Sequence, residues 1–292
     1  MWVIRHGDCT VYLLGTYHVS KWPTPPWFTG RLERAFTQSQ ELWLETSGEE
    51  VGLGASGGAR SIGHGSLSGL PPPTRVGQGD HFYFAPARPE ADASPSLAAQ
   101  LSAAEKARLV SVASSLSLSP SSVESMKPGA ALIYLSAVQL LRSGYKPAFG
   151  VDAVLQQKAE ARGELVRGLE TDASQEKLFP WFFSDAGGDK LKQLRRYLNN
   201  YPRQLWNTDR KLREWFAGHL IGTTTENTAT ANSAPEIYAL LIAARNVNFA
   251  HQIEARLKTS GVVFVAVGVA HLVGPDSVVD LLRRDAIAVK RY

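Results

Sequence analysis

The sequence predicts an α/β fold in which a central mixed β-sheet is flanked by helices. Strand-like and helix-like segments alternate along the 292 residues, which favours this class over an all-α or all-β fold. The strand at 41–45 has three adjacent apolar residues at its centre, as expected for a strand that is covered on both faces. With 44% hydrophobic and 20% charged residues, the chain has the composition of a globular protein that buries a core.

The periodicity of apolar residues places the elements along the chain. The first residues lead directly into a strand, and strands are predicted at 11–15, 41–45, 164–170 and 262–268, with an edge strand at 287–292. Helices are predicted at 97–116, 130–143, 152–162, 189–217 and 235–259, and an amphipathic stretch at 31–40 separates the first two of the listed strands. We expect a single domain over 1–292, and two similar halves within it are left open.

Residues 47–96 differ from the rest because they are rich in Gly, Ser, Pro and Ala. This composition predicts a flexible loop or insertion within the domain. The segment contains Gly-x-Gly-x-x-Gly at 52–57, but more Gly, Ser and Pro follow where a dinucleotide site needs a helix. The Gly-Ser-Leu-Ser-Gly run at 65–69 has Leu67 where a hydrolase would carry its nucleophile. We therefore expect neither site here.

Charge, cysteine content and hydropathy exclude several classes of protein. The net charge is +4 and the pI is about 9.1, but the basic runs are short and interrupted by apolar residues, so nucleic acid is not expected as a partner. Cys9 is the only cysteine, which excludes an internal disulfide and a Cys-based zinc cluster. No apolar run reaches the roughly 18 residues of a membrane span. We expect a cytoplasmic protein, or a periplasmic or secreted one if a leader is removed.

Four predicted strands end in residues able to bind a metal ion or move protons. A Gly-x-x-His turn ends "VYLLGTYH" at 11–18 and again "VFVAVGVAH" at 263–271, and two other strands end in glutamate. The four side chains are His18, Glu45, Glu170 and His271. Chemistry in α/β sheets gathers at the carboxyl ends of strands, and we expect Gly15 and Gly268 to let the chain turn sharply there. Singly, each side chain also fits an ordinary structural role.

The sequence resembles the TraB/GumN family, which is related to the Tiki metalloproteases and more remotely to EreA/ChaN-like hydrolases. The resemblance runs along nearly the whole chain, through "WVIRHGDCTVYLLGTYHVS", "AFTQSQELWLE", "MKPGAAL", "GVDAVLQQKA", "GELVRGLETDASQ", "RNVNFAHQI" and "VFVAVGVAHLVGPDSVVDLL". It implies that His18, Glu45 and His271 form a metal site. Asp152, Glu170 and Arg245 lie in recurrent segments of the family, with roles less well defined. The run at 47–96 departs from the family pattern.

These observations predict a metal-dependent hydrolase. One divalent ion (Mn, Co, Zn or Ca) held by His18, Glu45 and His271 would activate a water molecule. Glu170 is a candidate general base or further ligand, and Arg245 would stabilise an oxyanion or hold a substrate carboxylate; the alternative for Arg245 is a salt bridge to Asp152 or a neighbour. The same chemistry serves two substrate classes.

The Tiki resemblance favours a peptide or other amide substrate, whereas the esterase relatives favour a small acyl ester or lactone, such as an acyl-homoserine lactone. A third possibility is a protein that binds a peptide signal without cleaving it. The aromatic run "WPTPPWF" at 22–28 either lines an apolar acyl pocket or packs against the loop that follows. The oligomeric state is left open.

Overall fold

The fold is described from a computed structural model that defines residues 1–23, 26–46, 96–171, 181, 184 and 188–292. The predicted insertion at 47–96 therefore lies almost entirely outside the described residues. The chain divides into two compact units. The sheet unit comprises Met1–Gly63, Tyr145–Ala173 and Asp209–Tyr292, and the helical unit comprises His64–Gly144 and Ser174–Thr208.

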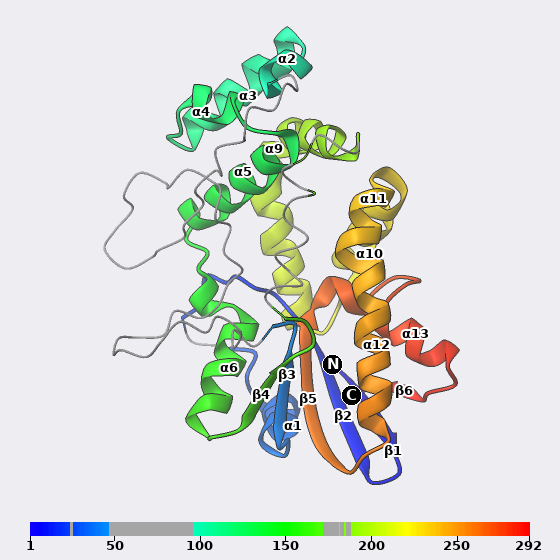
Figure 1. The fold of residues 1–292 in the computed structure, drawn as a ribbon. Helices are drawn as coiled ribbons and strands as arrows, with labels where there is room; N and C mark the ends of the chain where they lie inside the picture. The colour runs from blue at the N-terminus through cyan, green and yellow to red at the C-terminus, as the bar shows by residue number, and fades with distance from the viewer. Residues whose placement is uncertain (24–25, 47–95, 172–180, 182–183, 185–187) are drawn as a thin grey trace, which may run out of the picture. The chain divides into compact units, whose positions relative to one another are not determined.

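The sheet unit contains one mixed six-stranded sheet, which confirms the predicted α/β class (Figure 1). Its strands are β1 (Trp2–His6), β2 (Cys9–Thr16), β3 (Glu41–Leu44), β4 (Leu165–Gly168), β5 (Gly261–Gly268) and β6 (Val289–Arg291), in the spatial order β4-β3-β5-β2-β1-β6. The four strands from β4 to β2 are parallel, whereas β1 runs antiparallel to β2 and β6. All the predicted strands are present, and β6 is the edge strand that was expected.

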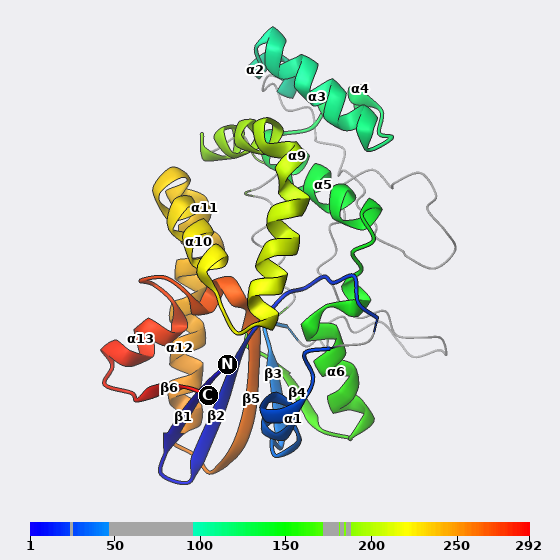
Figure 2. The same ribbon diagram turned by 180° about the vertical axis from the view of Figure 1, so that it is seen from behind.

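Both faces of the sheet are covered, because successive side chains of a strand point in opposite directions. In β5, Val263, Val265 and Val267 enter one apolar core, while Phe264 and Ala266 enter the other. The first core is closed by α12 (Ala244–Leu257) and α13 (Val278–Arg284), and the second by α1 (Gly30–Thr37), α6 (Val151–Ala161) and Trp215. Figure 2, turned by 180° from Figure 1, shows the face that α1 and α6 cover.

The remaining helices of the sheet unit stand at the carboxyl ends of the parallel strands (Figure 1). They are α10 (Ile221–Ser233), α11 (Pro235–Tyr238) and a π-helix, η2 (Ala239–Ala243), that runs directly into α12, together with the short 3₁₀ helices η1 (Pro147–Phe149) and η3 (Val269–Leu272). The helix predicted at 235–259 is thus interrupted by one π turn, a feature that often marks functional sites. The Thr-rich helix α10 is not among the predicted elements.

The helical unit has an apolar core of its own. It is built from α2 (Leu97–Gln100), α3 (Ala103–Ser115), α4 (Pro120–Glu124), α5 (Pro128–Arg142) and the first part of α9 (Asp189–Phe216). The helix predicted at 97–116 is two helices, because Ser102 caps α3. Its hydroxyl accepts the Glu105 N–H while the Glu105 carboxylate accepts the Ser102 N–H at 2.8 Å, the reciprocal arrangement of a capping box. Every helix in the described part of the chain is too short or too polar to traverse a bilayer.

Replacing Phe264 by Ala tests the importance of the covered central strand. Phe264 is fully buried and its ring lies 5.4 Å from that of Phe36, so the smaller side chain leaves a cavity. We expect the free energy of unfolding to fall by roughly 3–5 kcal/mol, measured by urea denaturation with far-UV circular dichroism. Val247→Ala, at a position 45% exposed on α12, should change it by less than about 0.5 kcal/mol. Equal effects of the two substitutions would contradict the assignment of Phe264 to the core.

Candidate functional site

The structure brings the predicted site residues together at the carboxyl edge of the parallel strands. In sheet order, β4, β3, β5 and β2 are followed by Glu170, Glu45, His271 and His18. Glu45 Oε1 lies 3.8 Å from His18 Nε2 and 3.6 Å from His271 Nε2. Residues from opposite ends of the sequence meet because β2 pairs with β5 in parallel, with Thr16 opposite Gly268.

Glu45 is the centre of this cluster and is buried. Its Oε1 atom accepts the backbone N–H of Gly268 at 2.6 Å. Burial opposes ionisation of the carboxyl, but the neighbouring imidazoles, the Arg245 guanidinium and this hydrogen bond together hold the pKa of Glu45 well below its usual range. Glu45 is therefore a carboxylate at neutral pH.

Gly268 is needed for close approach to the cluster and not for an unusual backbone conformation. Its φ and ψ are −49° and 134°, which most residues can adopt. A Cβ atom there would lie 3.0 Å from Glu45 Oε1 and 3.2 Å from His18 Nε2. Gly15 lies inside β2, and a Cβ on it would lie 3.0 Å from Val269. The two glycines thus make room for packing, whereas the sequence suggested a sharp turn.

Asp152, in the first turn of α6, binds the Nδ1 atom of His18, on the side of the ring away from Glu45. His18 Nδ1 lies 2.8 Å from Asp152 Oδ2, and Asp152 Oδ1 accepts the Thr16 hydroxyl at 2.6 Å. The negative charge of Asp152, with its hydrogen bond and a further contribution from Glu45, raises the pKa of His18 to about 9, although the side chain is 58% exposed. The imidazole therefore donates through Nδ1 and presents Nε2 towards Glu45.

His271 lies in η3 and is buried, with an exposed fraction of 3%. Burial lowers its pKa to about 4, and the positive charges of Arg245 and His18 act in the same direction. The ring is therefore neutral at pH 7. Its Nδ1 lies 2.6 Å from Asn246 Oδ1 and its Nε2 lies 3.2 Å from Arg245 Nη1. Because the guanidinium can only donate, Nε2 carries the lone pair and Nδ1 the proton.

Asn246 completes the site, although the sequence gave no reason to single it out. It is fully buried, and its amide Nδ2 donates to the Asp276 carbonyl at 2.6 Å while Oδ1 accepts from His271. It is adjacent to Arg245 in the segment "RNVNFAHQI", which also contains Asn248 at an exposed position. Only the helical spacing could have indicated that Asn246 is buried, since it lies on the same inward face of α12 as Phe249 and Ala250.

Arg245 links the two glutamates in a buried ion-pair network. Its Nε and Nη2 atoms bind the Glu170 carboxylate at 2.8 to 3.1 Å, and Nη2 also donates to Glu45 Oε2 at 2.5 Å. The three side chains are only 9–13% exposed. Nη1 donates to the Leu241 carbonyl of the π-helix at 3.2 Å. The salt bridge proposed for Arg245 thus forms with Glu45 and Glu170, whereas Asp152 binds His18.

The cluster opens into a cavity of about 410 Å³. His18, Glu45, Arg245 and His271 line it, whereas Glu170 is not among its lining residues and supports Arg245 from behind. One wall is apolar and comes from α11 and η2; it consists of Ile237, Tyr238, Leu241 and Ile242. A polar part of the lining consists of Thr223, Glu226, Asn227 and Thr230 of α10 with Lys211 of α9. Lys211 and Glu226 form an ion pair, so this part carries no net charge.

The donor chemistry of the cluster fits a divalent ion. Two imidazole Nε2 atoms and a carboxylate oxygen face one another, and both Nδ1 atoms are bound by acceptors, as is usual for metal-binding histidines. Gly268 leaves the space beside them free of a side chain. Among the described residues, however, no group of three His, Cys, Asp or Glu side chains has metal-binding geometry as it stands. Arg245 instead binds Glu45 Oε2 and His271 Nε2.

These features define an α/β protein with paired histidines and glutamates at the ends of its parallel strands. The chain belongs to the TraB/PrgY/gumN family, whose model matches residues 1–56 and 86–291. The match confirms the resemblance found in the sequence. Comparison with curated proteins and with solved structures gave no match.

Replacing Asn246 by Leu tests how the orientation of His271 is maintained. The near-isosteric side chain leaves His271 Nδ1 and the Asp276 carbonyl without their partner, so the free energy of unfolding should fall by about 1–3 kcal/mol. The tautomer of His271, read from imidazole ¹⁵N chemical shifts, should also change. Asn248→Leu is the matched control on the same helix. If the His271 spectrum is the same in both variants, Asn246 does not set the tautomer.

Proposed function

We propose that the protein is a metal-dependent hydrolase that uses a water molecule to cleave an amide or peptide bond. The observation that carries this proposal is the convergence of two imidazole Nε2 atoms and one buried carboxylate in the lining of a cavity. His18, Glu45 and His271 would hold the ion. When bound, a divalent ion polarises a carbonyl and generates a nucleophile from water at neutral pH.

The surrounding residues prepare the three ligands for this role. Asp152 and Asn246 bind the Nδ1 atoms and so direct both Nε2 atoms to the cavity side. The His18 ring, whose pKa is about 9, would release its Nε2 proton when an ion binds. The Gly268 N–H fixes one oxygen of Glu45. Such hydrogen bonds hold ligands in place before an ion or substrate arrives, which lowers the entropic cost of binding.

Arg245 is the group best placed to meet a substrate oxygen. It lines the cavity, its positive charge is permanent, and Glu170 binds it in a fork from the far side. We assign Arg245 to stabilising the developing oxyanion or holding a substrate carboxylate. Glu170 then positions the guanidinium. Its alternative roles as general base or metal ligand require this ion pair to open.

Metal content is the direct test of the proposed ligand set. Wild-type protein purified without a polyhistidine tag should contain about one divalent ion per chain by inductively coupled plasma mass spectrometry, because two imidazoles and a carboxylate are a complete catalytic set. His18→Ala and His271→Ala should contain none. His251→Ala, at an exposed position on α12, is the control. Negligible metal in wild type after incubation with Mn, Co, Zn and Ca would overturn the proposal.

Arg245→Gln should increase the affinity for a divalent ion. In the structure Arg245 occupies acceptors on Glu45 and His271 that the ion would use, and its charge repels a second cation. We expect at least roughly tenfold tighter binding of Zn²⁺, equivalent to about 1.4 kcal/mol, measured by competition with a chromophoric chelator. Arg245→Lys keeps the charge and is the control. Equal or weaker Zn²⁺ binding by a folded Arg245→Gln protein would contradict this competition.

The apolar wall of the cavity favours a second candidate, a hydrolase for acyl esters or lactones. Ile237, Leu241 and Ile242 would accept an acyl chain as well as an apolar amino-acid side chain. A panel of peptides, acyl-homoserine lactones and p-nitrophenyl esters, each assayed with and without chelator, separates the two activities. Binding of a peptide without turnover of any compound would favour the third interpretation, a signal-binding protein.

A further inference from the structure

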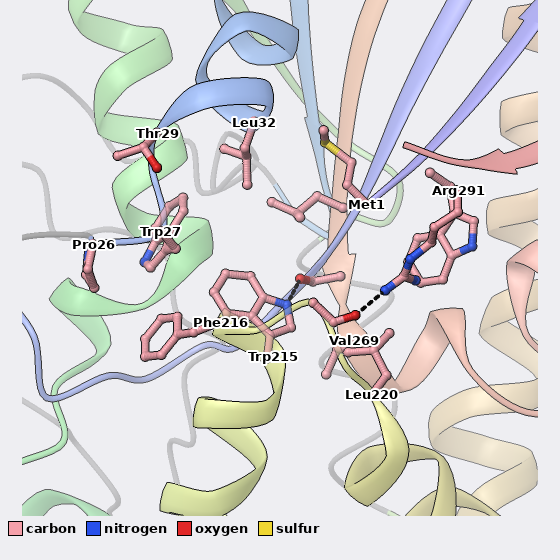
Figure 3. A pocket seen from close by; sticks show the side chains of 14 residues that line it. Met1, Pro26, Trp27, Thr29, Leu32, Trp215, Phe216, Leu220, Val269 and Arg291 are labelled. Atoms are coloured by element: carbon pink, nitrogen blue, oxygen red, sulfur yellow. Dashed lines mark hydrogen bonds between the residues drawn. The ribbon is translucent and has the colours of Figure 1, made fainter.

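The sheet unit contains a second cavity, of about 240 Å³, that the proposed hydrolase does not use (Figure 3). It shares only Val269 with the lining of the cavity at the histidine cluster. Its walls come from six segments of the chain and include Trp27, Leu32, Trp215, Phe216, Val269 and Arg291. Pro26 and Trp27 of the run at 22–28 line this cavity.

Aromatic side chains form one side of this cavity and are fixed in place. The ring of Trp215 lies 5.8 Å from that of Trp27 and 5.5 Å from that of Phe216, in edge-to-face geometry. Trp215 Nε1 donates to the Gly15 carbonyl at 2.7 Å, so the one polar atom of the indole is already satisfied. Figure 3 shows these rings facing the same space as Leu32. A flat apolar group would therefore meet a preformed surface.

The guanidinium of Arg291 lies on the opposite side of the same cavity (Figure 3). Arg291 Nη2 donates to the Gly218 carbonyl at 2.7 Å, and the guanidinium lies 4.3 Å from the centre of the Trp2 ring. Within the part of the chain that the structure describes, Arg291 forms no ion pair with a carboxylate. These contacts orient the guanidinium and leave its positive charge unbalanced.

We propose that this cavity binds a small monocarboxylate with a flat apolar body, such as an aryl-alkanoate. The ring would pack against Trp27, Trp215 and Phe216, and the carboxylate would bind Arg291. A guanidinium suits this role because its planar donors match both oxygens of a carboxylate. The volume is below the roughly 300–1,000 Å³ of pockets for drug-sized ligands, which limits the body to about one ring system.

The site is independent of the proposed hydrolase but touches the same structural elements. Val269 and the Trp215–Gly15 hydrogen bond belong to the walls of the cavity, and both involve the Gly-x-x-His turns that lead to His18 and His271. A ligand here would nevertheless not contact either imidazole, since neither lines this cavity. Binding at the two cavities is therefore separable by mutation.

The test uses 4-phenylbutyrate as probe and its neutral amide as control, with binding measured by isothermal titration calorimetry and tryptophan fluorescence. We expect wild type to bind the acid at least tenfold more tightly than the amide. Arg291→Gln and Trp27→Ala should each weaken binding of the acid at least tenfold. Lys290→Gln removes the same charge from the adjacent position of β6, which is not among the residues that line the cavity, and should leave binding unchanged.

His18→Ala distinguishes this cavity from the one at the histidine cluster, and it should also leave binding unchanged. Far-UV circular dichroism of every variant confirms that the fold is retained. The proposal is overturned if folded wild-type protein does not bind 4-phenylbutyrate at millimolar concentration. It is equally overturned if binding survives both Arg291→Gln and Trp27→Ala, or is lost in His18→Ala.

Discussion

The parallel pairing of β2, β5, β3 and β4 is the constraint on which the rest of the structure depends. In-register pairing places the carboxyl ends of the four strands side by side, with Thr16 opposite Gly268 and Leu44 opposite Gly168. The residues that follow are thereby delivered to one edge, whatever their separation in the sequence. A shift of one residue in either pairing would turn the side chains of the strand to the opposite face of the sheet and so remove them from their cores. The site is thus fixed by the same contacts that fold the sheet.

Grouping these residues requires that two carboxylates be buried together, and Arg245 is what makes that possible. An unpaired charge in such a place costs several kcal/mol, whereas a forked guanidinium satisfies both carboxylates. Neutral His271 adds no further charge. The folded protein therefore places a cation beside the three side chains that we propose as metal ligands. If an ion binds there as proposed, it would compete with Arg245 for Glu45, the same contact that makes the buried carboxylates tolerable.

The sequence predicted the sheet and the cluster because both depend on local patterns. Apolar runs marked the strands, and His18, Glu45, Glu170 and His271 each follow one. The helix α10 was missed because threonine and asparagine have low helix propensity; its threonines instead bond to carbonyls four residues earlier, as Thr224 and Thr228 do. The π turn at 239–243 and the contact between His271 and Asn246 could not be predicted from the sequence either, since both arise from packing between distant segments. Whether the chain forms two similar halves stays a prediction.

The two Gly-x-x-His motifs show why similar sequence patterns can have different physical causes. The position of Gly15 requires glycine because Val269 of the second motif packs closely against β2 there. The position of Gly268 requires it because the side chains of Glu45 and His18 approach the backbone. Each glycine is thus explained by residues of another segment. The spacing of three residues then carries each histidine past the strand end to the same carboxylate. The glycine and histidine of each motif are therefore explained by contacts with residues on neighbouring strands, and not by the local conformation of the motif itself.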